Sequence, residues 1–555
     1  MFQSSPVPTV PGWLPLRALV VVVVVGLSLV AVRRLSGERL TDPLRSRLLL
    51  GVPWGTLLTI TGVLLVYFVL QGAWNNARPL VTPFRTWSYF YPLGILTGPF
   101  THGGQGHVTG NVVGTLVYGT VVEYAWGHYP TERGTQTFTS LRTNPYARVL
   151  AVPIASVVVG VFTGLFSLGP VVGFSGVVFA MAGFALLVRP YLFLGALVTN
   201  RVVDLVLTAL RFPEPTVQGR TRFVTPWWSD VAIQGHAIGI LAGIVLAATL
   251  LWLRDQRPVP KRVFGVTLVF AVFQGLWAVY IPLGNARFTL FRWLGTALVF
   301  FLAAVIAAAT ADTDDHFILL PRFEAGWIGW AGIVLLVVLG TLSLGAVPGN
   351  LTTIDSGDVP EDGIEIRDYV VAYEEDVLNQ YAANIPTPIE TEQTRVNESG
   401  IVVASADREI WIAEVPKGQL ATNGRASVVV GGVGWRETVF ANRTTWNVVG
   451  NRSVYVVQLW RRGEDPRTSY RSPPSTADTT IAGRNVTVRP AGASFELAVT
   501  RDNETLATGP IPANTSARDI GGITFRHNRS RLYAEIDDTR VRIATVRTPP
   551  GQRRE

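Results

Sequence analysis

Long apolar runs recur through the first 350 residues of this chain, and they constrain its fold more than any other feature. A helix needs about 20 apolar residues to cross the hydrocarbon core of a bilayer, where its backbone polar groups must pair internally. Runs that reach or approach this length lie at residues 13–32, 49–71, 108–126, 149–168, 175–188, 191–211, 230–253, 263–283, 289–310 and 326–347. The sequence therefore predicts an α-helical polytopic membrane protein with ten spans.

The composition agrees with this prediction. Only 15% of the 555 residues are charged, against about 25% in soluble domains, and the mean hydropathy is +0.32. These values exclude a disordered protein and argue against a wholly soluble enzyme. The chain has no cysteine, which excludes disulfides, thiolate metal sites and cysteine nucleophiles.

The charge is divided unevenly between the two parts of the chain. Residues 351–555 carry 24 basic and 27 acidic side chains, whereas the first 350 residues carry 23 basic and 12 acidic ones. Basic residues between apolar spans set orientation in a bilayer, so we expect no nucleic-acid partner. The densest basic cluster, residues 33–47, is expected in the cytoplasm. Alternation then places the N-terminus and everything after the tenth span outside, with residues 18–32 as an anchor, not a cleaved signal peptide.

The region after the last apolar run has a different pattern. Short alternating segments such as 401–404, 409–413, 453–457 and 532–536, separated by Gly, Asn and Asp turns, predict a soluble β-rich domain of the sandwich type. Eight of its twelve asparagines lie in Asn-X-Ser/Thr sequons, and none of the six earlier asparagines does. These glycosylation candidates are Asn350, Asn397, Asn442, Asn451, Asn485, Asn503, Asn514 and Asn528. We expect a glycosylated extracytoplasmic stalk or recognition module, because no metal cluster or nucleophile constellation is visible in it.

Three clusters of polar residues fall inside or beside the apolar runs, where such residues are costly. The first contains His102, His107 and Asn111; the second is Gly173-Phe174-Ser175-Gly176; the third is His236-X2-Gly239-X3-Gly243. Each cluster alone has a structural interpretation, since a serine between glycines usually serves helix packing and an early-helix histidine can satisfy a helix end. Together they offer a nucleophile, a base and polar donors near the same side of the bilayer.

The chemistry of acyl transfer matches this combination. Serine becomes a good nucleophile when a histidine takes its proton, so Ser175 and His236 must meet across two helices. Small residues permit that close approach: Gly176, Ala180 and Gly183 on one helix, and Gly239 and Gly243 on the other. His107 and Asn111, four residues apart on one helix face, can donate to the developing oxyanion. No acidic residue is placed to orient His236, so we expect a dyad.

These motifs resemble those of the rhomboid family of intramembrane serine proteases, of a prokaryotic or archaeal type with extra helices and a C-terminal extracytoplasmic domain. The matching motifs are His102-X4-His107-X3-Asn111, Gly173-Phe174-Ser175-Gly176, His236-X2-Gly239-X3-Gly243 and Gly119-X3-Glu123-X3-Gly127, in this order. The resemblance covers residues 49–253 and implies a six-helix core. It implies Ser175 as nucleophile, His236 as general base, and His107, Asn111 and the Ser175 amide as the oxyanion hole. His102 and Glu123 would then be structural residues near the site, as would Gly173, Gly176, Phe179, Gly239 and Gly243.

The sequence departs from the family pattern at a few positions. Gly235 precedes the base where the family often has Ala, Phe179 replaces a tyrosine that stacks on the histidine, and Arg85-Thr86-Trp87 stands in place of a Trp-Arg pair. These departures affect the surroundings of the histidine and the first outer loop, and they leave the dyad intact.

The sequence thus predicts four parts: an accessory span and loop at 1–48, a protease core at 49–255, three accessory spans at 256–349 and a β-rich domain at 350–555. The expected activity is a cofactor-independent, metal-independent serine endopeptidase of the cell membrane, acting on transmembrane protein substrates. The alternative is an inactive relative that binds or escorts membrane proteins. A transporter is disfavoured, because no span shows paired charges or broken inverted halves.

Overall fold

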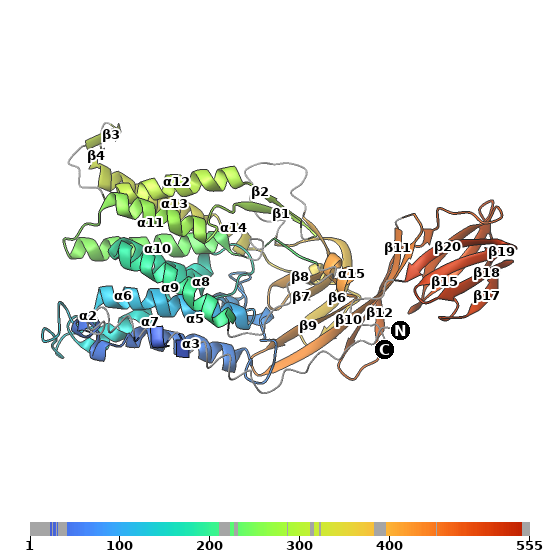
Figure 1. Cartoon of the computed structure of the whole chain (residues 1–555), viewed down its shortest axis with the longest axis horizontal. Coiled ribbons are helices and arrows are strands. Elements are labelled where there is room, and N and C mark those ends of the chain that lie inside the picture. The colour runs from blue at the N-terminus through green and yellow to red at the C-terminus, as the bar shows by residue number, and fades with distance from the viewer. Residues whose placement is uncertain are drawn as a thin grey trace.

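A computed structural model gives the conformation of the chain. It describes residues 23–24, 26–28, 30, 42–209, 223–226, 231–285, 287–310, 316–320, 323–381, 396–450 and 452–546. A layer of helices occupies one end of an elongated molecule, a first group of strands lies against one end of these helices, and a second group of strands lies farthest away (Figure 1).

The helical part follows the order of the apolar runs. Its helices are α2 (Asp42–Arg47), α3 (Trp54–Leu65), α4 (Pro92–Thr97), α5 (Gln105–Gly114), α6 (Thr120–Trp126), α7 (Pro145–Phe166), α8 (Ser175–Val188), α9 (Pro190–Ala209), α10 (Ile233–Leu253), α11 (Pro260–Phe273), α12 (Arg292–Ala308), α13 (Trp327–Leu344) and α14 (Val347–Asn350). A π-helical turn over Val66–Leu70 extends α3, and another over Thr115–Gly119 joins α5 to α6 into one continuous helix. Among the described residues, three segments are long and apolar enough on their own to cross a bilayer: Pro145–Phe166, Ile233–Leu253 and Ala331–Asn350.

The eighth predicted span, 263–283, is wrong in its second half. Helix α11 ends at Phe273, and the chain then forms a hairpin of β1 (Tyr280–Gly284) and β2 (Arg287–Leu290). The break follows from Gly275, whose φ of 68° favours glycine. A second hairpin, β3 (His316–Leu320) and β4 (Phe323–Gly326), lies at the opposite end of the bundle (Figure 1). Most of the first predicted span, 13–32, lies outside the described residues.

Helix α8 is the centre of the helical core. Twelve of its 14 residues are buried, and Ala182, Ala185 and Leu186 have no exposed surface. A helix that is apolar all round must be enclosed by other helices, and α7, α9, α10 and α11 pack around this one. Its first residue, Ser175, is therefore held in a fixed position at one end of the bundle.

The C-terminal region is built of antiparallel sheets. One sheet contains β5 (Ile364–Ile366), β6 (Tyr369–Leu378), β7 (Asn397–Ser405) and β8 (Ile410–Pro416), followed by a short helix α15 (Lys417–Asn423). The largest sheet contains β9 (Arg425–Gly432), β10 (Trp435–Val448), β11 (Arg452–Arg461), β12 (Arg467–Arg471), β17 (Ala517–Ile520), β18 (Ile523–Asn528), β19 (Arg531–Ile536) and β20 (Thr539–Val546). A third contains β13 (Ser475–Thr476), β14 (Asn485–Ala491), β15 (Ser494–Arg501) and β16 (Glu504–Pro510).

The long strands β10 and β11 are shared by two sandwiches, one formed with β5–β8 and the other with β14 and β15. On β11, Tyr455 and Val457 face the core shared with β5–β8, whereas Val454 and Val456 face the core shared with β14 and β15. Side chains alternate between the two faces of a strand, so a strand buried on both faces reads as a continuous apolar run. The prediction of a sandwich is confirmed, but the region contains two of them, with shared strands.

The sandwich that contains β5–β8 lies nearer the helices and packs directly on the loop between α3 and α5. Trp87 is 1% exposed and belongs to the same apolar core as Val371, Val403 and Val430 of the strands. The Trp87 ring lies 5.6 Å from that of Tyr381, and its Nε1 donates to the carbonyl of Thr82 at 3.0 Å. The position at which the sequence departs from the usual Trp-Arg pair is therefore an anchor for the β region.

Polar contacts reinforce this interface. Arg408 donates to the hydroxyl of Tyr91 at 3.2 Å and forms an ion pair with Asp368. Burial raises the pKa of Asp368, but the hydrogen bonds and positive charge of Arg408, together with hydrogen bonds from the Ser405 hydroxyl and the backbone, outweigh it and hold the pKa below its usual value. Arg85 reaches Glu414 of β8 at 3.5 Å. The sandwich and the loop therefore share an apolar core bordered by charge pairs.

Candidate active site

Ser175 and His236 meet at the end of the bundle that faces the β region. Ser175 is the first residue of α8, and His236 lies in the first turn of α10. The Ser175 Oγ and His236 Nε2 lie 2.8 Å apart, a normal hydrogen-bond distance. The two residues are 61 positions apart in sequence, so packing of α8 against α10 creates this pair.

Glycines allow the two helices to approach closely. A Cβ added at Gly239 would lie 2.2 Å from the carbonyl oxygen of Gly176, and one at Gly243 would lie 1.9 Å from that of Ala180. On the facing helix, a Cβ at Gly183 would lie 2.3 Å from the carbonyl oxygen of Ile240. Real Cβ atoms do not approach oxygens so closely, so each position requires glycine. These contacts set the separation that brings Oγ within reach of Nε2.

Aromatic stacking holds the imidazole of His236. The Phe179 ring lies parallel to it, with centroids 4.1 Å apart and an interplanar angle of 11°. Phe270 of α11 packs edge-on against Phe179 at 5.5 Å. His236 Nδ1 is buried and has no hydrogen-bond partner among the described residues. The orientation of the His236 ring therefore depends on stacking. The accessory helix α11 contributes to it through Phe270, which the sequence analysis did not identify.

The other predicted polar residues gather beside Ser175. Asn111 is 7% exposed, and its Nδ2 lies 2.9 Å from His102 Nε2. The rings of His102 and His107 are 5.0 Å apart. Gly173 has a φ of 123°, and a Cβ there would lie 2.5 Å from the His107 ring. The glycine two residues before Ser175 thus makes room for His107 against the turn that presents the serine.

Gln71 fixes the segment that carries His102. Its Nε2 donates to the carbonyls of Leu80 and His102, both at 2.9 Å, and its Oε1 accepts from the His102 amide at 2.8 Å. Gln71 is 1% exposed, so this clamp is shielded from water. His102 therefore holds Asn111 in place, which agrees with a structural role. Nothing in the sequence distinguishes Gln71 from other residues at the end of an apolar run.

A cavity of about 870 Å³ joins the serine–histidine pair to two of the neighbouring polar residues. Its lining includes Ser175, His236, His107 and Asn111. It also includes Arg85 from the loop that binds the β region and Gln274 and Tyr280 from the segment after α11. The cavity is large enough to admit an extended stretch of peptide, and its wall comes from the accessory segment as well as from the predicted core.

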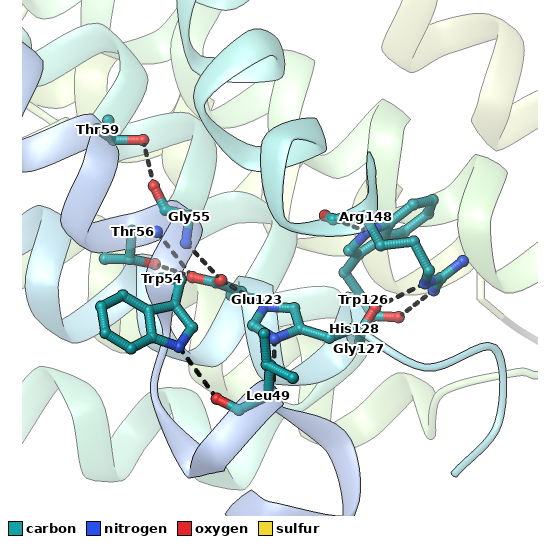
Figure 2. A network of polar contacts seen from close by, with 10 residues as sticks. All are labelled: Leu49, Trp54, Gly55, Thr56, Thr59, Glu123, Trp126, Gly127, His128 and Arg148. Atoms are coloured by element: carbon teal, nitrogen blue, oxygen red, sulfur yellow. Dashed lines mark hydrogen bonds and ion pairs between the residues drawn. The ribbon is translucent and has the colours of Figure 1, made fainter. Parts of the chain in front are cut away.

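Glu123 does not belong to this site, and the expectation that it lies near the site is wrong. It is 12 residues beyond Asn111 on the continuous helix 105–126, about 18 Å along the axis. Its carboxylate accepts hydrogen bonds from the amides of Gly55 and Thr56 and from the Thr56 hydroxyl, each at 2.7 Å (Figure 2). It also contacts His128 Nε2 at 2.6 Å. Glu123 therefore caps the N-terminus of α3, where a carboxylate satisfies free amides and the helix dipole.

Replacement of Glu123 by Ala is expected to destabilise the fold without directly altering the reacting groups. The change leaves two buried amides and His128 without their acceptor, at a cost of about 3–5 kcal/mol. Thermal unfolding of the purified variant in detergent measures this loss. Glu132→Ala, at an exposed position in the following loop, is the control and should unfold like the wild type. An unchanged transition for Glu123→Ala would contradict the capping role.

The sequon asparagines differ in accessibility. Asn350 is 2% exposed, and its Nδ2 donates to the carbonyls of Leu165 at 3.2 Å and Ser167 at 3.0 Å. A glycan cannot be attached to this side chain in the folded chain, so the structure argues against this candidate. Asn503, Asn514 and Asn528 are exposed, Asn397, Asn442 and Asn485 are half-buried, and Asn451 lies outside the described residues.

Taken together, these features define a polytopic helical membrane protein with a serine–histidine pair inside its bundle. Comparison with known families gives the class: residues 89–253 match the model of the Rhomboid domain. This part of the chain belongs to the rhomboid family, the family of intramembrane proteases and their relatives. No curated protein and no solved structure matches the chain significantly.

Proposed function

We propose that this protein is a serine endopeptidase that cleaves transmembrane protein substrates through a dyad of Ser175 and His236. The observation that carries the proposal is the 2.8 Å contact between Ser175 Oγ and His236 Nε2 inside a cavity of the rhomboid domain. A half-buried hydroxyl and imidazole in this arrangement are the parts of an activated nucleophile.

The first chemical step is acylation of the serine. Ser175 Oγ attacks the carbonyl carbon of the scissile peptide bond while its proton passes to His236 Nε2. The tetrahedral intermediate carries a negative oxygen, and His107, Asn111 and the Ser175 amide are the donors beside it. That amide belongs to the first turn of α8, where backbone N–H groups have no acceptor within the helix. His236 then returns the proton to the leaving amine, and the C–N bond breaks.

Hydrolysis of the acyl enzyme completes the cycle. A water molecule gives its proton to His236 Nε2 and attacks the ester carbonyl, and the Ser175 Oγ regains its proton when the product acid leaves. No carboxylate is required in either half-reaction. The stacked Phe179 ring keeps the imidazole aimed at Ser175 throughout.

The location of the reaction follows from the orientation of the helices. Helix α8 begins at Ser175, and Asn350, at the junction with the β region, bonds to carbonyls at the end of α7. The β region and the dyad therefore lie at the same end of the bundle. The arginine distribution and the sequons support an extracytoplasmic position for this end. We place cleavage near the outer face of the cell membrane, with the β region outside and the other end of the bundle in the cytoplasm.

A fluorophosphonate probe tests the nucleophile directly. The purified protein is expected to take up one probe molecule, and peptide mass spectrometry should locate it on Ser175, because only a hydroxyl deprotonated by a base displaces the fluoride efficiently. An inactive relative that only binds membrane proteins would remain unlabelled. Absence of labelling on folded protein would therefore reject the protease and favour the escort function.

Asn111→Ala tests the oxyanion site. The variant loses a donor and is expected to cleave about 10- to 1000-fold more slowly, mostly through kcat. Labelling of Ser175 should persist, because the dyad is intact. Since Asn111 also contacts His102, the thermal transition is measured in parallel. A wild-type rate in the variant would remove Asn111 from the site.

A further inference from the structure

A second cavity lies at the end of the bundle opposite Ser175. It has a volume of about 430 Å³ and is enclosed by the turn between α8 and α9 and the loop between α10 and α11. Three arginines line it: Arg189, Arg257 and Arg262. No carboxylate is among its lining residues in the described part of the chain. The cavity is therefore strongly positive and open to a negatively charged ligand.

The neighbouring arginines cap the end of a helix, whereas Arg189 of the cavity makes a long hydrogen bond of this kind, from Nη1 to the carbonyl of Val188 at 3.4 Å. Arg47, Arg148 and Arg254 already donate to carbonyls at the C-terminal end of α6, among them those of Ala125 and Trp126. Arg189 and Arg262, in contrast, form no ion pair within the described residues, and both side chains are exposed. The Arg262 guanidinium lies over the Tyr191 ring at 4.6 Å, which orients it at the cavity without neutralising it.

Apart from Gln256, the remaining lining is largely apolar. Val188, Leu192, Leu251 and Val259 contribute to the wall. From the cavity an exposed apolar stripe runs along α9; its members are seven, four and three residues apart and thus lie on one helix face. It consists of Tyr191 (61% exposed), Val198 (62%), Val202 (51%) and Leu205 (67%). A ligand that fits both features has an anionic head and a hydrocarbon chain.

We propose that this cavity binds the phosphate group of an anionic phospholipid, with an acyl chain along the exposed stripe of α9. Arginine guanidinium groups match phosphate oxygens in geometry and charge. The cavity lies at the ends of α8 and α10, which is the level of the headgroups for helices that span the bilayer. The bound lipid ties α8, α9, α10 and α11 together at this end. This inference is independent of the proposed protease activity.

The binding experiment uses full-length protein in detergent and native mass spectrometry, with phosphatidylglycerol and phosphatidylcholine as the two probes. Both lipids carry a phosphodiester, but only phosphatidylglycerol has a net charge. We expect the wild-type protein to retain phosphatidylglycerol in preference to phosphatidylcholine. The Arg189→Gln/Arg262→Gln double variant should bind it about 30-fold more weakly, since each basic residue near a membrane surface contributes about a five-fold preference. Binding of phosphatidylcholine should not change.

The control is Arg133→Gln/Arg142→Gln, which removes two exposed arginines from the loop between α6 and α7, at the same end of the bundle but outside the cavity. It should bind like the wild type. Equal losses in both double variants, or no loss in the cavity variant, would overturn the proposal. A third arm adds inorganic phosphate: displacement of the lipid at millimolar phosphate would assign the site to the free ion and overturn the lipid assignment. If the double variant does not fold, each single variant is measured instead, and each is expected to bind phosphatidylglycerol about five-fold more weakly than the wild type.

Discussion

Ser175→Ala and His236→Ala are each expected to abolish cleavage of a single-span reporter by protein reconstituted in liposomes. Without Oγ no acyl enzyme forms, and without Nε2 the hydroxyl keeps its proton, so either change should reduce the rate by about 10⁴-fold or more. Because both residues act in one proton transfer, the double variant should be no slower than the singles. The measurement is the appearance of the cleaved fragment with time at saturating enzyme.

A matched control separates loss of chemistry from loss of fold. Ser156 is a buried serine of α7 whose Oγ donates to the carbonyl of Val152, and it does not line the cavity that contains Ser175. Ser156→Ala should cleave at the wild-type rate. All variants should retain the thermal transition of the wild type within a few degrees. Residual cleavage near the wild-type level in either Ser175→Ala or His236→Ala would remove the dyad from the mechanism.

Local patterns in the sequence were enough to find most of the described helices and the polar residues that the structure brings together beside Ser175. Apolar length marks helices regardless of what surrounds them, and the spacing of His107 and Asn111 places them on one helix face. The glycines at 239 and 243 signalled close helix contact for the same reason. These features depend on neighbours within a few turns, and such relations are visible in a sequence.

Features that depend on distant packing were missed or misplaced. Glu123 was expected near the site from the resemblance of its motif to the rhomboid pattern, yet its partners Gly55 and Thr56 come from another helix, far from Ser175. Phe270 contacts Phe179 only because α11 packs against α8 and α9. In the sequence, Trp87 lies in a loop between two apolar runs. The strands that bury it come from the β region, hundreds of residues later. A single sequence carries no record of such pairings.

Gly243→Ala is expected to separate α8 from α10 and so slow cleavage about 100-fold through packing alone. The added Cβ would lie 1.9 Å from the carbonyl oxygen of Ala180, and backbone atoms there cannot rotate away as a side chain can. Overpacking of this kind costs about 1–3 kcal/mol or more, which outweighs the gain of about 1 kcal/mol that alanine gives over glycine in a helix. Displacement of the helices by even 1 Å would lengthen the contact between Ser175 and His236 and slow cleavage about 100-fold.

The control for this prediction adds a Cβ at a helical glycine that has free space around it. Gly265 of α11 is exposed, and no atom lies within 4 Å of a Cβ added there, so Gly265→Ala should unfold at or above the wild-type temperature and cleave normally. The two alanine variants are therefore expected to shift the thermal transition in opposite directions. Cleavage is measured well below both transitions, so that a slow rate in Gly243→Ala reports the geometry of the dyad and not unfolding. A Gly243→Ala variant as stable and active as Gly265→Ala would show that the distance between these helices is not what sets the dyad.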